Sequence, residues 1–315
     1  MAIIDRQGAE GLFPEDVARE IIQGSVNQSA VLTLGTRLPD MTTKQRRLPV
    51  LESLPMAYFV NGDTGYKQTS AANWGNKFIE AEEIAVIVPI PEAVLDDADY
   101  DLFEQIQPLV RQAFGATLDR AVLFGTNKPA SWEDGIAVTA AAVGNAVTAG
   151  TGADLYEDIL GENGVISLVE EDGFMVNGHI GAMGLRGRLR GLRDANGQPI
   201  FTRSMQDSNR YDLDGSPIYF PRNGALENEG ELLISGDFTN LVYAIRQDLT
   251  FKVLTEAVIQ DPATGEIVYN LAQQDMVALR CVMRLGWQVP NPLNSVNGTD
   301  SRFPFAVLTD GTVGA

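Results

Sequence analysis

Residues 99–126 read DYDLFEQIQPLVRQAFGATLDRAVLFGT and carry the clearest helix signal in the chain. Apolar residues recur there every three to four positions, as on one face of a helix. That face comprises Leu102, Ile106, Leu109, Ala113, Thr117 and Ala121, reinforced by Phe103, Val110, Phe114 and Leu118. Asp99 or Asp101 suits the N-terminal cap and Gly125 the C-terminal stop. We expect a helix of about 36 Å, which Pro108 kinks or splits because proline lacks a backbone donor.

The segment before this helix combines strand-like ends with a polar middle. RRLPVL (46–51) and KFIEAEEIAVIVPIP (77–91) have strand composition, and AYFV (57–60) leads into NGDTGYKQTSAANWGN (61–76). This last piece holds three Gly and three Asn, so it cannot bury itself. The pattern predicts an extended β-hairpin with a polar tip near 61–76. A projecting hairpin is marginal alone, and we expect it to lie on a neighbouring molecule.

The N-terminal third and the centre carry weaker signals. Residues 1–13 read as a loose arm, and an amphipathic helix is expected from Pro14 to Gly24. AVLTLGTRL (30–38) reads as a strand. WEDGIAVTAAAVGNAVTAGTG (132–152) reads as a strand followed by a flexible crossing, which we take as a domain boundary.

Helix and strand signals mix after residue 153. We expect helices in LYEDILGENGVISLVEEDG (155–173) and GAMGLRGRLRGLRDANGQPIF (181–201), the second ending at 196–197. Expected strands are FMVNGHI (174–180), SPIYFPRN (216–223), GELLISGDF (230–238), NLVYAIRQ (240–247) and LTFKVLTEA (249–257). MVALRCVMRLGWQV (276–289) alternates apolar residues with Arg280 and Arg284, which predicts a long strand with one buried face. The fold class is α+β.

Length and charge limit the classes of function. The 315 residues suffice for one large domain or two ordinary ones. No apolar run reaches the roughly 20 residues of a membrane helix, and the start MAIIDRQGAE lacks a signal-peptide pattern. We therefore expect a protein made and kept in a cytoplasm, with no membrane partner. A net charge of −19 disfavours tight nucleic-acid binding.

The chain has one cysteine, Cys281, and one histidine, His179. These counts exclude intramolecular disulfides, cysteine-rich zinc sites and multi-histidine metal centres within one chain. A Ser-His-Asp triad would need His179, yet no G-x-S-x-G elbow is present, so we expect a structural histidine. The glycine-rich pieces GENG and GAMGLRG fit neither a Walker A loop nor a dinucleotide fingerprint. We expect no catalytic residue, no metal site and no cofactor.

Acidic pairs raise the question of a carboxylate-dependent hydrolase. The pairs are Glu82-Glu83, Asp96-Asp97 and Glu170-Glu171. Adjacent carboxylates point to opposite sides of a strand or diverge on a helix, so they do not form a convergent acid/base pair. We expect these residues on a solvated surface and keep the hydrolase as a remote alternative.

Four arginines form the sharpest basic feature: Arg186, Arg188, Arg190 and Arg193. On a helix, Arg186, Arg190 and Arg193 share one face. The leucines Leu185, Leu189 and Leu192 share another. The basic face can pair with acidic residues of a neighbouring subunit, bind phosphate or remain solvated.

Several segments, taken in order, resemble the tailed-phage major capsid proteins of the Hong Kong 97-type fold. VPIPEAVLDDADYDLFEQIQPLVRQAFGATLDRAVLFGT (88–126) is similar to that family's succession of strand, proline-bounded turn and spine helix. Further likeness lies in SLVEEDGFMVNGHI, LRGLRDANGQPIF, GDFTNLVYAIRQDLTFKVLTEA and NLAQQDMVALRCVMRLGW. The resemblance covers roughly residues 14–290 and is most specific in 86–126 and 236–287.

The resemblance implies a Hong Kong 97-type capsid fold with an N-terminal arm, an extended β-hairpin loop, a peripheral domain with a long spine helix, and an axial domain. The implied parts are the N-terminal arm 1–35, the extended loop 52–88, the peripheral domain 36–51 and 89–144 with spine helix 98–125, the axial domain 145–248, the peripheral strands 249–289 and the C-terminal segment 290–315.

Some members of the family join a loop lysine to a neighbour's asparagine. Lys67 and Lys77 lie on the expected loop, and Asn291, Asn294 and Asn297 lie near the C-terminus. No acidic residue follows those asparagines before Asp300. We therefore expect no covalent cross-link.

The implied function is structural. We expect subunits that self-assemble into hexamers and pentamers of an icosahedral phage capsid around double-stranded DNA, without tight DNA binding, assembled in the bacterial host cytoplasm. An encapsulin-type nanocompartment shell is the alternative. Partners implied are a portal, decoration proteins and a separate scaffolding protein. The residues before Pro14 lack a heptad pattern, so we expect little proteolysis of this subunit.

Overall fold

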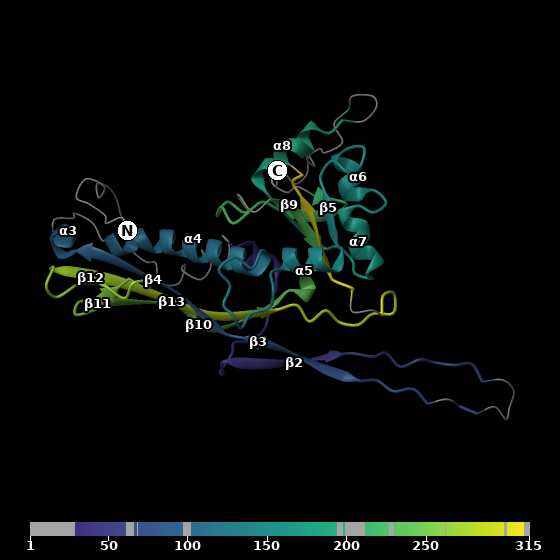
Figure 1. The fold of residues 1–315 in the computed structure, drawn as a ribbon, viewed down its shortest axis with the longest axis horizontal. Helices are drawn as coiled ribbons and strands as arrows, with labels where there is room; N and C mark the ends of the chain where they lie inside the picture. The colour runs from purple at the N-terminus through teal and green to yellow at the C-terminus, as the bar shows by residue number, and fades with distance from the viewer. Residues whose placement is uncertain are drawn as a thin grey trace.

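The structure, a computed structural model, describes residues 29–60, 66–67, 69–96, 102–193, 198, 212–226, 230–261, 263–298 and 301–311. Figure 1 shows an elongated molecule in which a long helix lies along a flat sheet, a second lobe rises from one end, and a thin hairpin extends below it. Mixed helices and strands confirm the α+β class. The helix expected at 14–24 and the helix stop expected at 196–197 lie outside the described residues.

A four-stranded sheet forms the floor of the lower body. Its order is β1 (Thr36–Arg37), β10 (Val242–Leu254), β13 (Met276–Gln288) and β4 (Glu82–Pro91). β13 pairs antiparallel with both β10 and β4. The strands expected at 240–247 and 249–257 are therefore one strand, and the boundary expected at residue 248 falls inside it.

Helix α4 (Leu102–Leu123) confirms the predicted spine helix. Pro108 lies inside it without splitting it in two. Gly125 follows the helix with a φ of 72°, a left-handed conformation that suits glycine and ends the helix. The expected caps Asp99 and Asp101 lie outside the described residues.

Helix α4 buries only part of the predicted apolar face. Leu109 is 64% exposed, and Ala113 and Thr117 are exposed as well. The buried stripe runs through Ile106, Val110, Phe114, Leu118 and Ala121. Two apolar stripes run along this helix, and the stripe with the larger side chains is buried because it removes more apolar area from water.

Two segments predicted as strands each contain a helix followed by a short strand. Residues 30–38 form α2 (Ala30–Leu34) followed by β1, and Ser29 caps α2 by accepting a hydrogen bond from the Leu32 amide. Residues 132–152 contain α5 (Ile136–Val143), which ends at Gly144 with a φ of 100°, and then β5 (Ala146–Thr148). Alanine is the strongest helix former, and three consecutive alanines in α5 outweigh the strand-like valines.

A six-stranded sheet forms the upper lobe. Its order is β5, β14 (Phe305–Thr309), β9 (Glu231–Gly236), β6 (Gly178–Gly181), β8 (Ser216–Tyr219) and β7 (Asp212–Leu213). Its outer face is covered by α6 (Leu155–Leu160), α7 (Val165–Glu171) and α8 (Met183–Gly191). The single helix expected at 155–173 is thus two helices. β14 brings part of the expected C-terminal segment 290–315 into this sheet.

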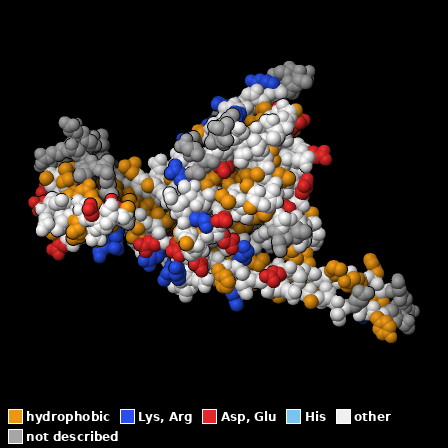
Figure 2. Space-filling model, in the orientation of Figure 1, with side chains coloured by type: hydrophobic (Ala, Val, Ile, Leu, Met, Phe, Trp, Pro, Cys, Tyr) orange, Lys and Arg blue, Asp and Glu red, His pale blue; other side chains and the backbone are white. Residues whose placement is uncertain are grey.

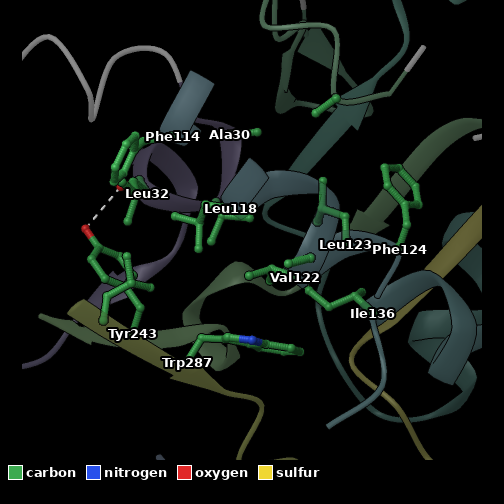
Figure 3. Packing of buried hydrophobic residues seen from close by; sticks show 14 of the residues in the cluster. Ala30, Leu32, Phe114, Leu118, Val122, Leu123, Phe124, Ile136, Tyr243 and Trp287 are labelled. Atoms are coloured by element: carbon green, nitrogen blue, oxygen red, sulfur yellow. Dashed lines mark hydrogen bonds between the residues drawn. The ribbon is translucent and has the colours of Figure 1, made fainter. Parts of the chain in front are cut away.

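One hydrophobic core joins the two lobes. Side chains of α2, α4 and α5 pack between β10 and β13 below and the inner face of the six-stranded sheet above, where Ile234 and Phe305 lie. Figure 3 shows Leu118 and Val122 of α4 pointing toward Tyr243 and Trp287 of the lower sheet. The Tyr243 hydroxyl donates to the Leu32 carbonyl at 3.2 Å, which ties β10 to α2.

Both faces of β13 are buried, whereas the sequence predicted one. Leu279 and Cys281 face the helix side, and Met276 and Ala278 lie under the small hairpin of β11 (Val258–Gln260) and β12 (Ile267–Asn270). Only Arg280 is exposed on this strand. The sequence could not show the second cover, because β11 and β12 are only three and four residues long.

The predicted extended hairpin is present with different bounds. β2 (Gln45–Leu51) and β3 (Trp74–Glu80) pair antiparallel, and the last pair toward the tip is Leu51 with Trp74. Residues 82–88, expected in the loop, lie in β4 and pair with β13. The described residues of the projecting part are therefore 52–60, 66–67 and 69–73. The remaining short elements are α3 (Glu92–Asp96) and the 3₁₀ turn η2 (Phe238–Asn240).

Candidate assembly surfaces

The hairpin has a firm base. Ile79 of β3 is fully buried. The Phe78 carbonyl accepts a hydrogen bond from the Gln288 side chain at 3.0 Å, and the Glu80 carbonyl accepts one from the Trp132 indole at 3.0 Å. Lys77 pairs with Glu133 at 3.1 Å. The base thus belongs to the body of the molecule and fixes the direction in which the arm projects.

Beyond the base, the arm has almost no support from its own chain. From Pro55 to Val60 every residue is exposed, as are the described residues 66–74. The two sides are joined by few hydrogen bonds, among them Glu52 N–H to the Asn73 carbonyl at 2.9 Å. We define the arm as residues 52–73. An isolated hairpin of this kind is unstable in water unless something covers it.

Large apolar side chains gather on the arm. Figure 2 shows hydrophobic side chains near its far end. Phe59 and Tyr66 are fully exposed, Met56 and Tyr58 are also exposed, and so is Trp74 of β3 beside the arm. Exposed aromatic and methionine side chains on a projecting element are typical of a surface that another protein covers. The sequence analysis missed these residues, because it placed Tyr58 and Phe59 in a strand and Tyr66 and Trp74 in a polar tip.

The four arginines lie on α8 and just beyond it. Arg188 pairs with Asp310 at 2.7 Å. Leu185 and Leu189 are buried beneath the helix, as the predicted leucine face requires. Arg190 and Arg193 are exposed on the opposite side.

The single histidine lies in the centre of the six-stranded sheet. His179 and Ser235 are both fully buried, with the histidine Nδ1 and serine Oγ 2.8 Å apart. Nε2 lies 3.2 Å from the Leu213 carbonyl, which can only accept, so Nε2 carries the proton and Nδ1 accepts from Ser235. Burial lowers the pKa of His179 to about 4. A substrate cannot reach this pair, so the residues play a structural part.

We expect the free energy of unfolding to fall in acid because of His179. The folded pKa of about 4 lies below the ordinary 6.5, so between these values the unfolded chain binds a proton that the folded chain excludes. This contribution is complete above pH 6.5 and is lost as pH falls toward 4, by about 3 kcal/mol in all. Denaturant unfolding of the wild type and of His179→Gln at pH 7 and pH 4.5 measures it. Equal losses in both proteins would contradict the assignment.

Most of the other candidate residues form contacts within their own chain. Glu82 accepts from Ser131 at 2.8 Å, and Glu83 pairs with Arg284. The amides of the three expected asparagines donate as follows: Asn291 to the Arg302 carbonyl, Asn294 to the Asp172 carbonyl and Asn297 to the Asp172 carboxylate. Lys67 is exposed on the arm. The absence of a cross-link stays a prediction.

Two further observations concern the described residues alone. No three of their histidine, cysteine or acidic side chains come together in a group that could hold a metal ion. Their helices are each too short or too polar to cross a bilayer. Cys281 is buried in the sheet, and burial raises the pKa of its thiol to about 11.

The described architecture, a spine helix over a sheet with a projecting hairpin and an upper lobe, matches a known family. The model of the phage capsid family matches residues 10–296. The chain belongs to the phage capsid family. Its role is therefore structural, as a subunit of the virion shell, and the hydrolase and nanocompartment alternatives are not favoured.

Individual relatives agree with this membership. The major capsid protein of Staphylococcus phage 80alpha is 28% identical over 284 residues, which cover 89% of this chain and 82% of the relative. The solved structure titled Microbacterium phage Oxtober96 has a TM-score of 0.78 at 35% identity, with 98% of this chain and 100% of that chain covered. The Mycobacterium phage Cain structure has a TM-score of 0.78 at 31% identity, over 99% and 100% of the two chains.

Proposed function

We propose that this capsid subunit assembles into hexamers and pentamers of an icosahedral shell, and that the arm of each subunit lies on a neighbour. The observation that supports this most is the arm itself. Its base is fixed to the body, while its far part exposes aromatic side chains that its own chain leaves uncovered. A cover from a second copy would remove these side chains from water, at roughly 25 cal/mol per Å² of apolar area.

Each of the two lobes would form one domain of the proposed capsid subunit. The lower sheet with α4 would form the peripheral domain. The six-stranded sheet with α6, α7 and α8 would form the axial domain that meets its copies around the hexamer and pentamer axes. β14 would belong to the axial domain, because it pairs with β9 and β5. Residues 1–28 of the expected N-terminal arm lie outside the described residues.

Double-stranded DNA, a separate scaffolding protein, a portal and decoration proteins complete the proposal. They are implied by the family resemblance. The DNA would be enclosed by the shell without being tightly bound to it, because a chain of net charge −19 neutralises few phosphates.

We expect isolated subunits to bind duplex DNA more weakly than about 1 µM at about 150 mM salt, because non-specific binding depends on phosphate neutralisation. Fluorescence anisotropy with a labelled duplex measures this affinity. The variant Arg190→Glu/Arg193→Glu serves as the control and should differ little from the wild type. A tighter wild-type affinity that the variant loses would show that the arginine face binds phosphate instead.

A further inference from the structure

Acidic and basic residues lie in separate stretches of the upper lobe, which consists of the six-stranded sheet with α6, α7 and α8. Residues 146–185 contain seven acidic residues and no basic one, whereas residues 186–193 contain four arginines and no acidic one. The acidic stretch forms β5, α6, α7 and β6, and the basic stretch forms most of α8. Two neighbouring parts of one lobe thus carry opposite charge.

The acidic part presents its carboxylates to solvent. We call the exposed residues Asp154, Glu157, Glu162, Glu170 and Glu171 the acidic margin. Figure 2 shows acidic side chains along the edge of the upper lobe where α6 and α7 lie. Within the described residues no lysine or arginine pairs with this margin, whose printed contacts are to backbone amides and to Ser167.

The basic part is held rigidly and faces away from the sheet. Leu185 and Leu189 anchor α8 on the sheet. The Arg190 Nε donates to the Arg186 carbonyl at 3.3 Å, and Arg193 donates to the Arg190 carbonyl at 3.0 Å. These are backbone carbonyls, so among the described residues no carboxylate neutralises Arg190 or Arg193. Figure 2 shows basic side chains over α8, away from the acidic edge.

We propose that Arg190 and Arg193 of one copy pair with the acidic margin of the next copy in the ring. A second copy is the partner that the charges fit, because every copy presents both surfaces. A contact between two different surfaces of identical chains is head-to-tail, and it forms a ring where the rotation from one copy to the next closes. The pairing also relieves the repulsion among chains of net charge −19. The inference rests on the proposed assembly into rings and adds the residues that set the register around the axis.

Reversing either surface should impair assembly, and reversing both should restore it. One variant is Arg190→Glu/Arg193→Glu, and the other is Glu157→Lys/Glu162→Lys/Glu170→Lys. Each places like charges across the contact, and we expect the protein concentration needed for assembly to rise about tenfold or more. A chain carrying both sets has the two charges exchanged and should assemble within about threefold of the wild type. Arg188→Gln is the matched control, because Arg188 pairs with Asp310 within the chain.

Sedimentation of capsomers and shells over a concentration series measures the effect, with thermal unfolding to verify folding. Wild-type assembly should also weaken between about 50 and 500 mM NaCl, where charges are screened. The proposed pairing is wrong if the reversed variants assemble like the wild type, or if the chain carrying both sets of substitutions does not regain assembly. Neither outcome contradicts the assembly into rings. If the wild type itself forms no rings, the proposed function fails. If a reversed variant does not fold, absence of any salt effect on the wild type would overturn the pairing.

Discussion

Shortening the arm should abolish closed shells and leave the subunit folded. The change replaces residues 53–72 with Asn-Gly, which joins Glu52 to Asn73, the next pair in register after Leu51 and Trp74, through a two-residue turn that suits a hairpin. The bond from Glu52 N–H to the Asn73 carbonyl remains, and so does the whole of β3. Because the arm touches little of its own chain, its loss should change the free energy of unfolding by less than about 1 kcal/mol. Electron microscopy and thermal unfolding measure the two effects.

Point variants test the contribution of the arm's side chains without changing the length of the arm. Phe59→Ser/Tyr66→Ser keeps the arm and removes its two fully exposed rings. Buried aromatic anchors in interfaces are each worth about 2 kcal/mol or more, and a shell repeats the loss in every subunit. Lys67→Ala, also on the exposed arm, is the control and should assemble normally. Normal shells from the shortened chain would contradict the role that we propose for the arm.

The second large effect concerns the buried carboxylate of Asp119 on α4. It accepts four hydrogen bonds: from the Ser29 hydroxyl at 2.6 Å, the Ala30 amide at 2.9 Å, the Val31 amide at 3.1 Å and the Asn223 side chain at 2.6 Å. Two of these donors are the first amides of α2, so the carboxylate also meets the positive end of that helix. Burial raises the pKa of Asp119, and the hydrogen bonds oppose the rise.

Asp119→Ala should lower the free energy of unfolding by about 4 kcal/mol, because it leaves several buried donors without an acceptor. Asp119→Asn keeps one acceptor oxygen and should lose about half as much. Asp40→Ala is the control, since Asp40 forms only an exposed pair with Arg37 and should cost less than about 1 kcal/mol. Urea unfolding followed by tryptophan fluorescence measures all three. A loss for Asp119→Ala no larger than the control's would contradict the anchoring role.

Asp119 also shows what the sequence could not reveal. The segment 30–34 has the composition of a strand, and its helix depends on a carboxylate 89 residues away from Ala30. Likewise, β14 pairs with β5, more than 150 residues earlier in the chain, and no local pattern indicates that partnership. The apolar period predicted the positions of α4 and β13 well, because that signal is local. The choice between two apolar stripes on α4 depended on which neighbours the fold supplied.

The candidate surfaces were predictable to different degrees. The arginine face on α8 followed from residue spacing, because Leu185 and Leu189 fixed the opposite face. The hairpin followed from its polar centre, yet the exposed Phe59 lay in a stretch with the composition of a strand, and the exposed Tyr66 lay in the stretch read as polar. Exposure of such residues is a property of the three-dimensional neighbourhood, and the sequence holds no local signal for it.

The most direct test of the central claim is an electron-microscopic reconstruction of the purified assembly. We predict closed icosahedral shells built of hexamers and pentamers, with residues 52–73 of each subunit lying on an adjacent subunit. The six-stranded lobe should point toward the hexamer and pentamer axes. A monodisperse monomer or small soluble oligomer at concentrations where related capsid subunits form shells would contradict the account, as would shells in which the arm stays uncovered.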